Sequence, residues 1–216
     1  MPEPGRGRAR RAAGAAMWAI AAAYVVEAVV ASIYERHGRL DGIVHGAGVL
    51  DDHVVADKAP DAFARVFSTK VDAARTLLGA VRRATANGGW GQPAFVTFFG
   101  SIAGVCGNRG QVDYAAANDA LDTMAAANRD VAARVVSLDW GPWAPGAGMV
   151  DASLARLFEE SGMGLIEVGD GTAAVLDEIA VPADDAVAQV VVARCSFDLM
   201  AASLTHGRFQ TAGAHA

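Results

Sequence analysis

The sequence FFGSIAGVCGNRGQVDYAAANDALDTM, residues 98–124, decides the fold because it joins a strand, a glycine-rich loop and a helix. The strand covers residues 94–99 (AFVTFF) and so ends inside the quoted stretch. It is a continuous apolar run of the kind that is buried on both faces of a parallel sheet. Residues 100–110 predict a loop, and residues 113–128 predict a helix. Ser101 therefore follows the strand directly, at the sheet edge where such folds bind ligands.

Strands and helices alternate on both sides of this stretch. The pattern predicts an α/β fold, a Rossmann-like doubly wound parallel sheet with helices on both faces. Three glycine-rich loops, which begin at Gly46, Gly100 and Gly141, each follow a strand, so we expect them along one edge. The other expected elements are helices at 16–36, 60–86, 153–161 and 171–179, a short strand that runs into a glycine-rich turn within 40–48, and strands at 134–138 and 187–192.

Composition and charge exclude several classes of protein. The 216 residues are 53% hydrophobic and 19% charged, which predicts a packed domain. The net charge of −6 argues against nucleic acid as a partner. Basic residues 5–11 and the apolar run at 12–26 have the layout of a signal peptide, but the run is mostly alanine and too short to span a membrane. We favour an amphipathic helix over a targeting signal and expect a cytoplasmic protein with no membrane contact. No cysteine or histidine has metal-ligand spacing.

The candidates for a proton-transfer site are four polar residues: Lys70, Ser101, Tyr114 and Asn118. Tyr114 and Asn118 are spaced i, i+4 at the start of one helix and so share a face. A tyrosine can protonate a developing alkoxide only if its pKa falls from about 10 toward neutrality, and a nearby ammonium would lower it. Lys58 and Lys70 are the two lysines of the chain, and Lys70, early in the preceding helix, is the candidate.

The same residues resemble the ketoreductase domain of type I polyketide synthases, a branch of the short-chain dehydrogenase/reductases. That family has Ser, Tyr thirteen residues on and Asn four further, and Ser101, Tyr114 and Asn118 fit this pattern. Lys70, in FSTKVDAARTLL, matches the family's catalytic lysine. It precedes Ser101 by 31 residues, more than we expect for the family, and the loop NGGWGQP at 87–93 accounts for the excess.

The resemblance extends from about Tyr24 to Val192 and implies NADPH as the cofactor. RLDGIVHGAGVLDD (39–52) is similar to the segment that passes the adenosine side of the cofactor, which implies a role for Gly46, Ala47 and Gly48. LDWGPWAPGAGMV (138–150) is similar to the loop at the nicotinamide carboxamide, with Gly141 and Pro142 at its start. Trp143 either shapes the substrate groove or packs in the core, and Met149 is assigned to the groove with it. The implied partners are a β-ketoacyl chain on an acyl carrier protein and other polyketide synthase domains.

The stereochemical type also follows from the resemblance. Leu50, Asp51 and Asp52 match the LDD motif of B-type ketoreductases, which give the D-configured hydroxyl. Cys106 stands eight residues before Tyr114, where A-type enzymes carry tryptophan. The alternative is that the two aspartates only cap a turn.

A phosphate-binding glycine turn of the TGxxxG type is not found in the sequence. Gly5, Gly7 and Gly14 follow no strand, so we expect the first cofactor-binding βαβ units to be missing and the sheet to be incomplete. The expected organisation is an unmatched N-terminus (1–23), the C-terminal part of a ketoreductase domain, truncated at its N-terminus (24–204), and a disordered tail (205–216). The alternative to an active enzyme is an inactive remnant, or a scaffold half that requires a partner chain.

Overall fold

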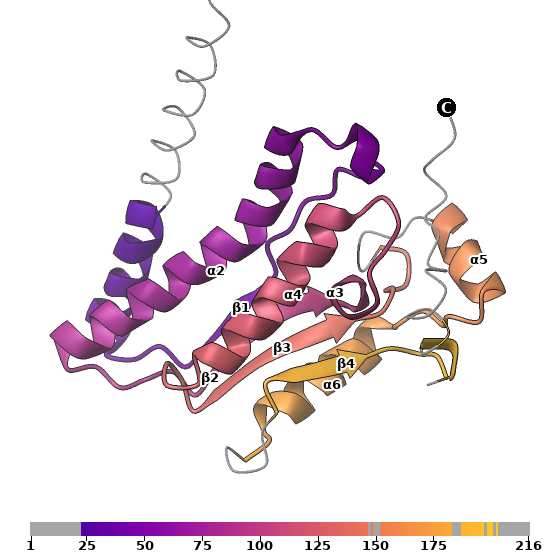
Figure 1. Ribbon diagram of the computed structural model, residues 1–216. Helices are drawn as coiled ribbons and strands as arrows, with labels where there is room; N and C mark the ends of the chain where they lie inside the picture. Colours follow the sequence, from indigo (N-terminus) through magenta and orange to yellow (C-terminus); the bar gives the residue numbers. More distant parts are fainter. Residues whose placement is uncertain are drawn as a thin grey trace, which may run out of the picture. The chain divides into compact units, whose positions relative to one another are not determined.

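A computed structural model describes residues 23–146, 148, 152–182, 187–196, 198–200 and 202. The chain divides into two compact units, one formed by residues 1–40 and 75–92 and the other by residues 41–74 and 93–216. The second unit carries a parallel sheet with its covering helices, which confirms the predicted α/β fold (Figure 1). Among the described residues, no helix combines the length and the apolar character needed to cross a lipid bilayer.

The sheet has four parallel strands in the order β1-β2-β3-β4. The long central pair aligns Val96 with Val135 and continues to Ser101 opposite Trp140. Ser101 is therefore the last residue of its strand, where the sequence had predicted the start of a loop. The strands are β1 (Gly42–His45), β2 (Phe95–Ser101), β3 (Arg134–Trp140) and β4 (Gln189–Val192).

The helices follow the predicted order with shifted ends. A helix over 23–37 lies in the first unit. The long helix α2 begins at Pro60, as predicted, and ends at Gly88, two residues later than predicted. One helix was not predicted: α3 forms inside the expected loop because Ser101 Oγ accepts a hydrogen bond from the backbone N–H of Ala103, 3.2 Å away. It ends at Gly107, whose φ of 69° suits glycine. The elements are η1 (Val55–Asp57), α2 (Pro60–Gly88), α3 (Ile102–Cys106), α4 (Val112–Ala127), α5 (Ala152–Glu160) and α6 (Val168–Ile179).

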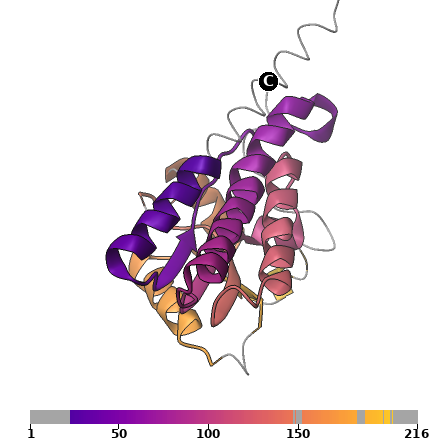
Figure 2. The ribbon, with the colours of Figure 1, turned by 90° about the vertical axis from the view of Figure 1, so that its left-hand side faces the viewer.

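The central strand β3 is buried on both faces. Val136, Leu138 and Trp140 pack on one face with Ile166 and with residues of α6. The alternate residues, among them Asp139, face the side on which α4 packs. Figures 1 and 2 show α4 and α6 on opposite sides of the sheet. This double coverage explains why AFVTFF and RVVSL read as nearly continuous apolar runs in the sequence.

Candidate active site

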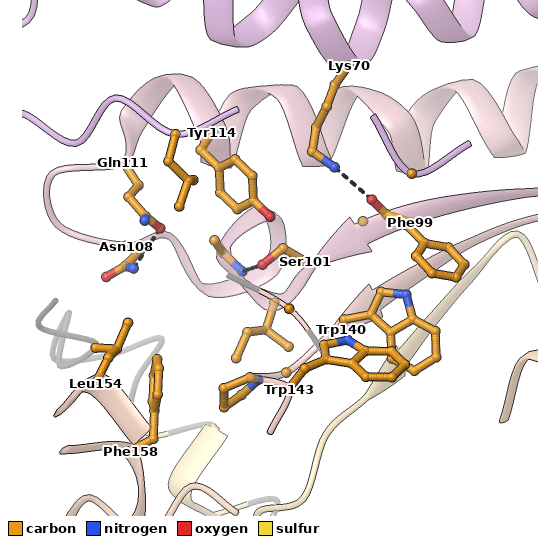
Figure 3. A pocket seen from close by; sticks show the side chains of 18 of the residues that line it. Lys70, Phe99, Ser101, Asn108, Gln111, Tyr114, Trp140, Trp143, Leu154 and Phe158 are labelled. Carbon is orange, nitrogen blue, oxygen red and sulfur yellow. Dashed lines mark hydrogen bonds between the residues drawn. The ribbon is translucent and has the colours of Figure 1, made fainter. Parts of the chain in front are cut away.

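A cavity of about 300 Å³ opens at the carboxyl ends of β1, β2 and β3. Gly46, Ser101 and Gly141, which follow or end these three strands, all line it. The three glycine-rich loops therefore meet at one edge, as expected for a parallel α/β sheet. Figure 3 shows Ser101, Tyr114 and Lys70 around this space, with Leu154 and Phe158 of α5 on another wall.

The serine and the tyrosine come from two elements that the short helix α3 connects. Ser101 lies at the end of β2, and its oxygen accepts from the N–H of Ala103, so its O–H can donate either to Tyr114 or to a ligand. Tyr114 lies in the first turn of α4 and lines the same cavity. Asn118, one turn further along, is fully buried and donates from Nδ2 to the carbonyl of Tyr114 at 2.7 Å. Asn118 Oδ1 has no hydrogen-bond partner among the described residues.

Lys70 reaches the cavity from α2 and is only 4% exposed. Its Nζ donates to the carbonyl of Phe99 at 2.7 Å and lies 5.4 Å from the centroid of the Tyr114 ring. The backbone of Lys70 is held in turn by the ring of His45, whose Nε2 lies 2.9 Å from the Lys70 carbonyl oxygen. Burial lowers the pKa of Lys70 to about 8, although the charges of Asp139 and Asp122 raise it.

The pKa of Tyr114 moves in the direction opposite to our expectation. Burial raises it, and hydrogen bonding with Ser101 and Asn118 lowers it by less. The sequence argument assumed that the lysine would act on the tyrosine hydroxyl. In the structure the ammonium donates to the Phe99 carbonyl and lies over the ring, so the expected lowering of the tyrosine pKa is wrong for this state. The hydroxyl keeps its proton in this state, and it can act as an acid only if bound ligands lower its pKa.

Residues 50–58 are tied to the loop before Tyr114 by buried polar contacts. Lys58 Nζ donates to Asp113 Oδ2 at 2.8 Å, and both side chains are almost fully buried. Gln111 Nε2 donates to Asp52 Oδ2 at 2.9 Å, and Gln111 Oε1 accepts from Asn108 Nδ2 at 2.8 Å. These contacts fix the approach of the LDD segment to the start of α4.

Of the LDD residues, Leu50 lines the cavity and the two aspartates do not. Asp51 instead contacts Arg65 and His53 through its carboxylate. Lys58, Asp113 and Gln111 were not recognised from the sequence. The one feature of the sequence that could have pointed to Lys58 is that the chain has only two lysines.

The remaining predicted residues divide between the cavity wall and its surroundings. Pro142 and Trp143 line the cavity with Gly46 and Gly141, whereas Ala47 and Gly48 do not. Met149 lies outside the described residues. Leu154 and Phe158, which the sequence analysis did not assign to the site, line the cavity from α5.

A planar ring could enter between the strand ends because the glycines leave room there. A Cβ on Gly46 would have only the Phe99 ring within 4 Å, at 3.9 Å. The donor Lys70 and the hydroxyls of Ser101 and Tyr114 face this space (Figure 3). The cavity of about 300 Å³ lies in the usual range of ligand pockets, and its glycines, hydroxyls and ammonium are compatible with the nicotinamide end of a dinucleotide.

Gly100 is required for close packing beneath the site. A Cβ there would lie 2.3 Å from Asp139 Oδ1 and 3.0 Å from Ser137 Oγ. We expect Gly100→Ala to lower the free energy of unfolding by about 1–3 kcal/mol, as overpacking in a core does. Gly169→Ala is the matched control because a Cβ in that helix meets nothing within 4 Å. Equal unfolding midpoints for the two variants in urea would contradict the close approach at Gly100.

Comparison with known proteins places these features in one family. The sequence profile of the KR domain matches residues 13–145, beginning ahead of Tyr24, where we expected the resemblance to start. A polyunsaturated fatty acid synthase chain from Thraustochytrium sp. is 39% identical over 145 residues, which are 67% of this chain and 5% of that protein. Mycoketide-CoA synthase from Mycobacterium tuberculosis is 40% identical over 159 residues, 69% of this chain and 4% of that protein.

A solved ketoreductase structure is also similar to this chain. The ketoreductase from the first module of phoslactomycin biosynthesis in Streptomyces sp. HK803 superposes with a TM-score of 0.73 at 26% identity. The match covers 86% of this chain and 41% of the ketoreductase. The chain thus spans less than half of that structure and a small part of the curated relatives.

Proposed function

Because the chain belongs to the KR domain family of the polyketide synthases, within the short-chain dehydrogenase/reductases, we propose that it reduces a β-keto group to a β-hydroxyl. The substrate would be a polyketide or fatty acyl thioester on a carrier protein, and NADPH would be the hydride donor. The observation that carries this proposal is the convergence of Lys70, Ser101 and Tyr114 on one cavity at the carboxyl ends of three parallel strands.

The proposed reaction needs a hydride at the carbonyl carbon and a proton at the carbonyl oxygen. Gly46, Gly141 and Pro142 would hold the nicotinamide, which would supply the hydride. Ser101 donates a hydrogen bond to the carbonyl oxygen and polarises the bond. Tyr114 gives its proton to the same oxygen as the C–O double bond becomes a single bond. Stabilisation of the phenolate that remains requires the Lys70 ammonium to turn from the Phe99 carbonyl toward the phenol oxygen, since in the free chain it lies over the ring.

Asn118 and the apolar wall have supporting roles in this proposal. The unpartnered Asn118 Oδ1 is an acceptor that a proton-carrying water could meet. Leu154, Phe158 and Trp143 would hold the acyl chain because they form apolar parts of the cavity lining.

The direct test is the reduction of a β-ketoacyl N-acetylcysteamine thioester by the full chain, followed by chiral chromatography of the product. We propose B-type stereochemistry, since Leu50 lines the cavity and Asp52 is held by Gln111. A D-configured hydroxyl is expected. The L product would refute the stereochemical proposal, and no product from folded protein at millimolar NADPH would refute the reductase proposal.

Lys70 should give the reaction a pH dependence. An ammonium with a pKa near 8 loses its proton as the pH rises through that value, so the rate should fall above about pH 8. Lys70→Met should lower kcat by about tenfold or more and abolish this alkaline limb. Lys58→Met is the control for loss of a buried lysine at the edge of the site. An unchanged alkaline limb in Lys70→Met would exclude Lys70 as its origin.

A second candidate function is that of a half-enzyme that acts with a partner chain. Among the described residues, no strand pairs with the outer edge of β1, where Val44 is 53% exposed. If the chain is a half-enzyme, it should bind NADPH weakly when it is isolated, and we expect weak binding. Fluorescence titration of the full chain measures it, and micromolar binding would overturn the half-enzyme reading.

A further inference from the structure

Two buried carboxylates and an amide lie behind the cavity, on the α4 side of the sheet. Gln189 Nε2 donates to Asp122 Oδ2 at 2.8 Å and to Asp139 Oδ2 at 2.7 Å. Asp139 is fully buried and Asp122 is 8% exposed. The three residues come from β4, α4 and β3, so the fold brings together groups that are far apart in the sequence. None of them lines the cavity, and the proposed reaction does not use them.

The nearby charge that this cluster faces is Lys70. Its side chain is almost fully buried, and no ion pair joins it to a carboxylate of the described residues. The carboxylates that act on it through space are Asp139 first and Asp122 second. A buried ammonium without a compensating negative charge would be costly, because burial penalises the charged form.

We propose that Asp122 and Asp139, which the Gln189 amide holds together, share one proton between them, and that the single negative charge left on the pair at neutral pH keeps Lys70 an ammonium. In this assignment the pair acts on the reaction only through Lys70, by keeping its side chain charged. Its catalytic consequence rests on the proposed function, whereas the charge balance itself does not.

Two observations support a single shared proton. Asp122 Oδ1 and Asp139 Oδ1 are buried and have no hydrogen-bond partner among the described residues, and a carboxyl proton held between the two side chains would supply a donor for these oxygens. Burial also raises the pKa of both carboxyls, to about 7 for Asp139. Their mutual contact lowers the pKa of Asp122 and raises that of Asp139, which puts the proton on Asp139.

The surroundings of the pair contain few other charges. Asp119, on the exposed side of α4, raises the pKa of Asp122. Ser137 beside the pair is buried and neutral, and its Oγ has no hydrogen-bond partner among the described residues. The remaining titratable groups that sense Lys70 or Asp139 are His45 at the end of β1, Cys106 of α3 and Tyr114 of α4. Lys70 is thus the cation that acts on both carboxyls of the pair.

The test uses the full chain labelled with ¹³Cε-lysine, because two lysines give two signals that can be followed during a pH titration. The double variant Asp122→Asn/Asp139→Asn removes the negative charge and should lower the titration midpoint of Lys70 by about one unit or more. Each single variant keeps one carboxylate and should lower the midpoint by less than the double variant does. Lys58 serves as the internal reference, and Asp119→Asn is the matched control for loss of a nearby surface charge.

A second measurement needs no variant. In the ¹³Cγ-aspartate spectrum of the wild type, one buried carboxyl should titrate near neutrality, and its signal should be absent from Asp139→Asn. Two carboxyls that both titrate below about pH 5 would overturn the shared proton. A double variant with the wild-type Lys70 midpoint would overturn the charge balance, even where the reductase assay succeeds.

Discussion

Tyr114→Phe should lower the rate of β-keto reduction by about 10²–10⁴-fold, the contribution of a positioned general acid. The phenol oxygen is the only heavy atom lost, and the ring keeps its place beneath Lys70. The unfolding free energy should therefore stay close to that of the wild type. The measurement is kcat with a β-ketoacyl thioester at saturating NADPH, together with urea unfolding of the same preparation.

The control for this variant is Tyr24→Phe. Tyr24 is 74% exposed on the first helix, so its hydroxyl should matter neither to the rate nor to the stability. Retained turnover in Tyr114→Phe would remove Tyr114 from the acid role. A loss of rate that is matched by a loss of folded protein would leave that role without support.

Phe98→Ala should lower the free energy of unfolding by about 3–5 kcal/mol, the usual cost of deleting a buried phenylalanine. Phe98 is 0% exposed in the middle of β2, and its ring meets the His45 ring edge-on at 6.1 Å between centroids. Domains of ordinary size are stable by about 5–15 kcal/mol, so this one change should remove a large part of the total.

Val44→Ala is the matched control, because Val44 lies on the neighbouring strand and is more than half exposed. Its cost should be well below that of Phe98→Ala, about 1 kcal/mol or less. Urea midpoints measured side by side give the comparison. Similar midpoints for the two variants would mean that β2 does not form the core of the sheet.

The sequence predicted the elements whose signals are local. The run AFVTFF predicted a strand buried on both faces, and the i, i+4 spacing of Tyr114 and Asn118 placed them on one helix. The helix α3 was missed because its start depends on the Ser101 side chain, which turns from the strand end to cap Ala103. That hydrogen bond cannot be read from glycine content alone.

The sequence named Lys70, Ser101 and Tyr114 as candidates, and the structure places all three around one cavity, whereas the electrostatics of this group were not predicted. The acid pair was not predictable, because Asp122, Asp139 and Gln189 come together only through the register that sets Ser137 opposite Gln189. The direction of the Tyr114 pKa likewise depends on burial and on where the Lys70 ammonium points, which spacing along the chain does not determine.

Transfer of deuterium tests the central claim most directly. The full chain is incubated with a β-ketoacyl thioester and NADPH that carries deuterium at the nicotinamide C4 position, and the product is analysed by mass spectrometry and NMR. The account predicts a β-hydroxyacyl thioester with deuterium on the carbon that bears the new hydroxyl, at a rate that Tyr114→Phe reduces by about a hundredfold or more. Recovery of the unreduced ketone from folded protein, or an equal rate of transfer in the two proteins, would contradict it.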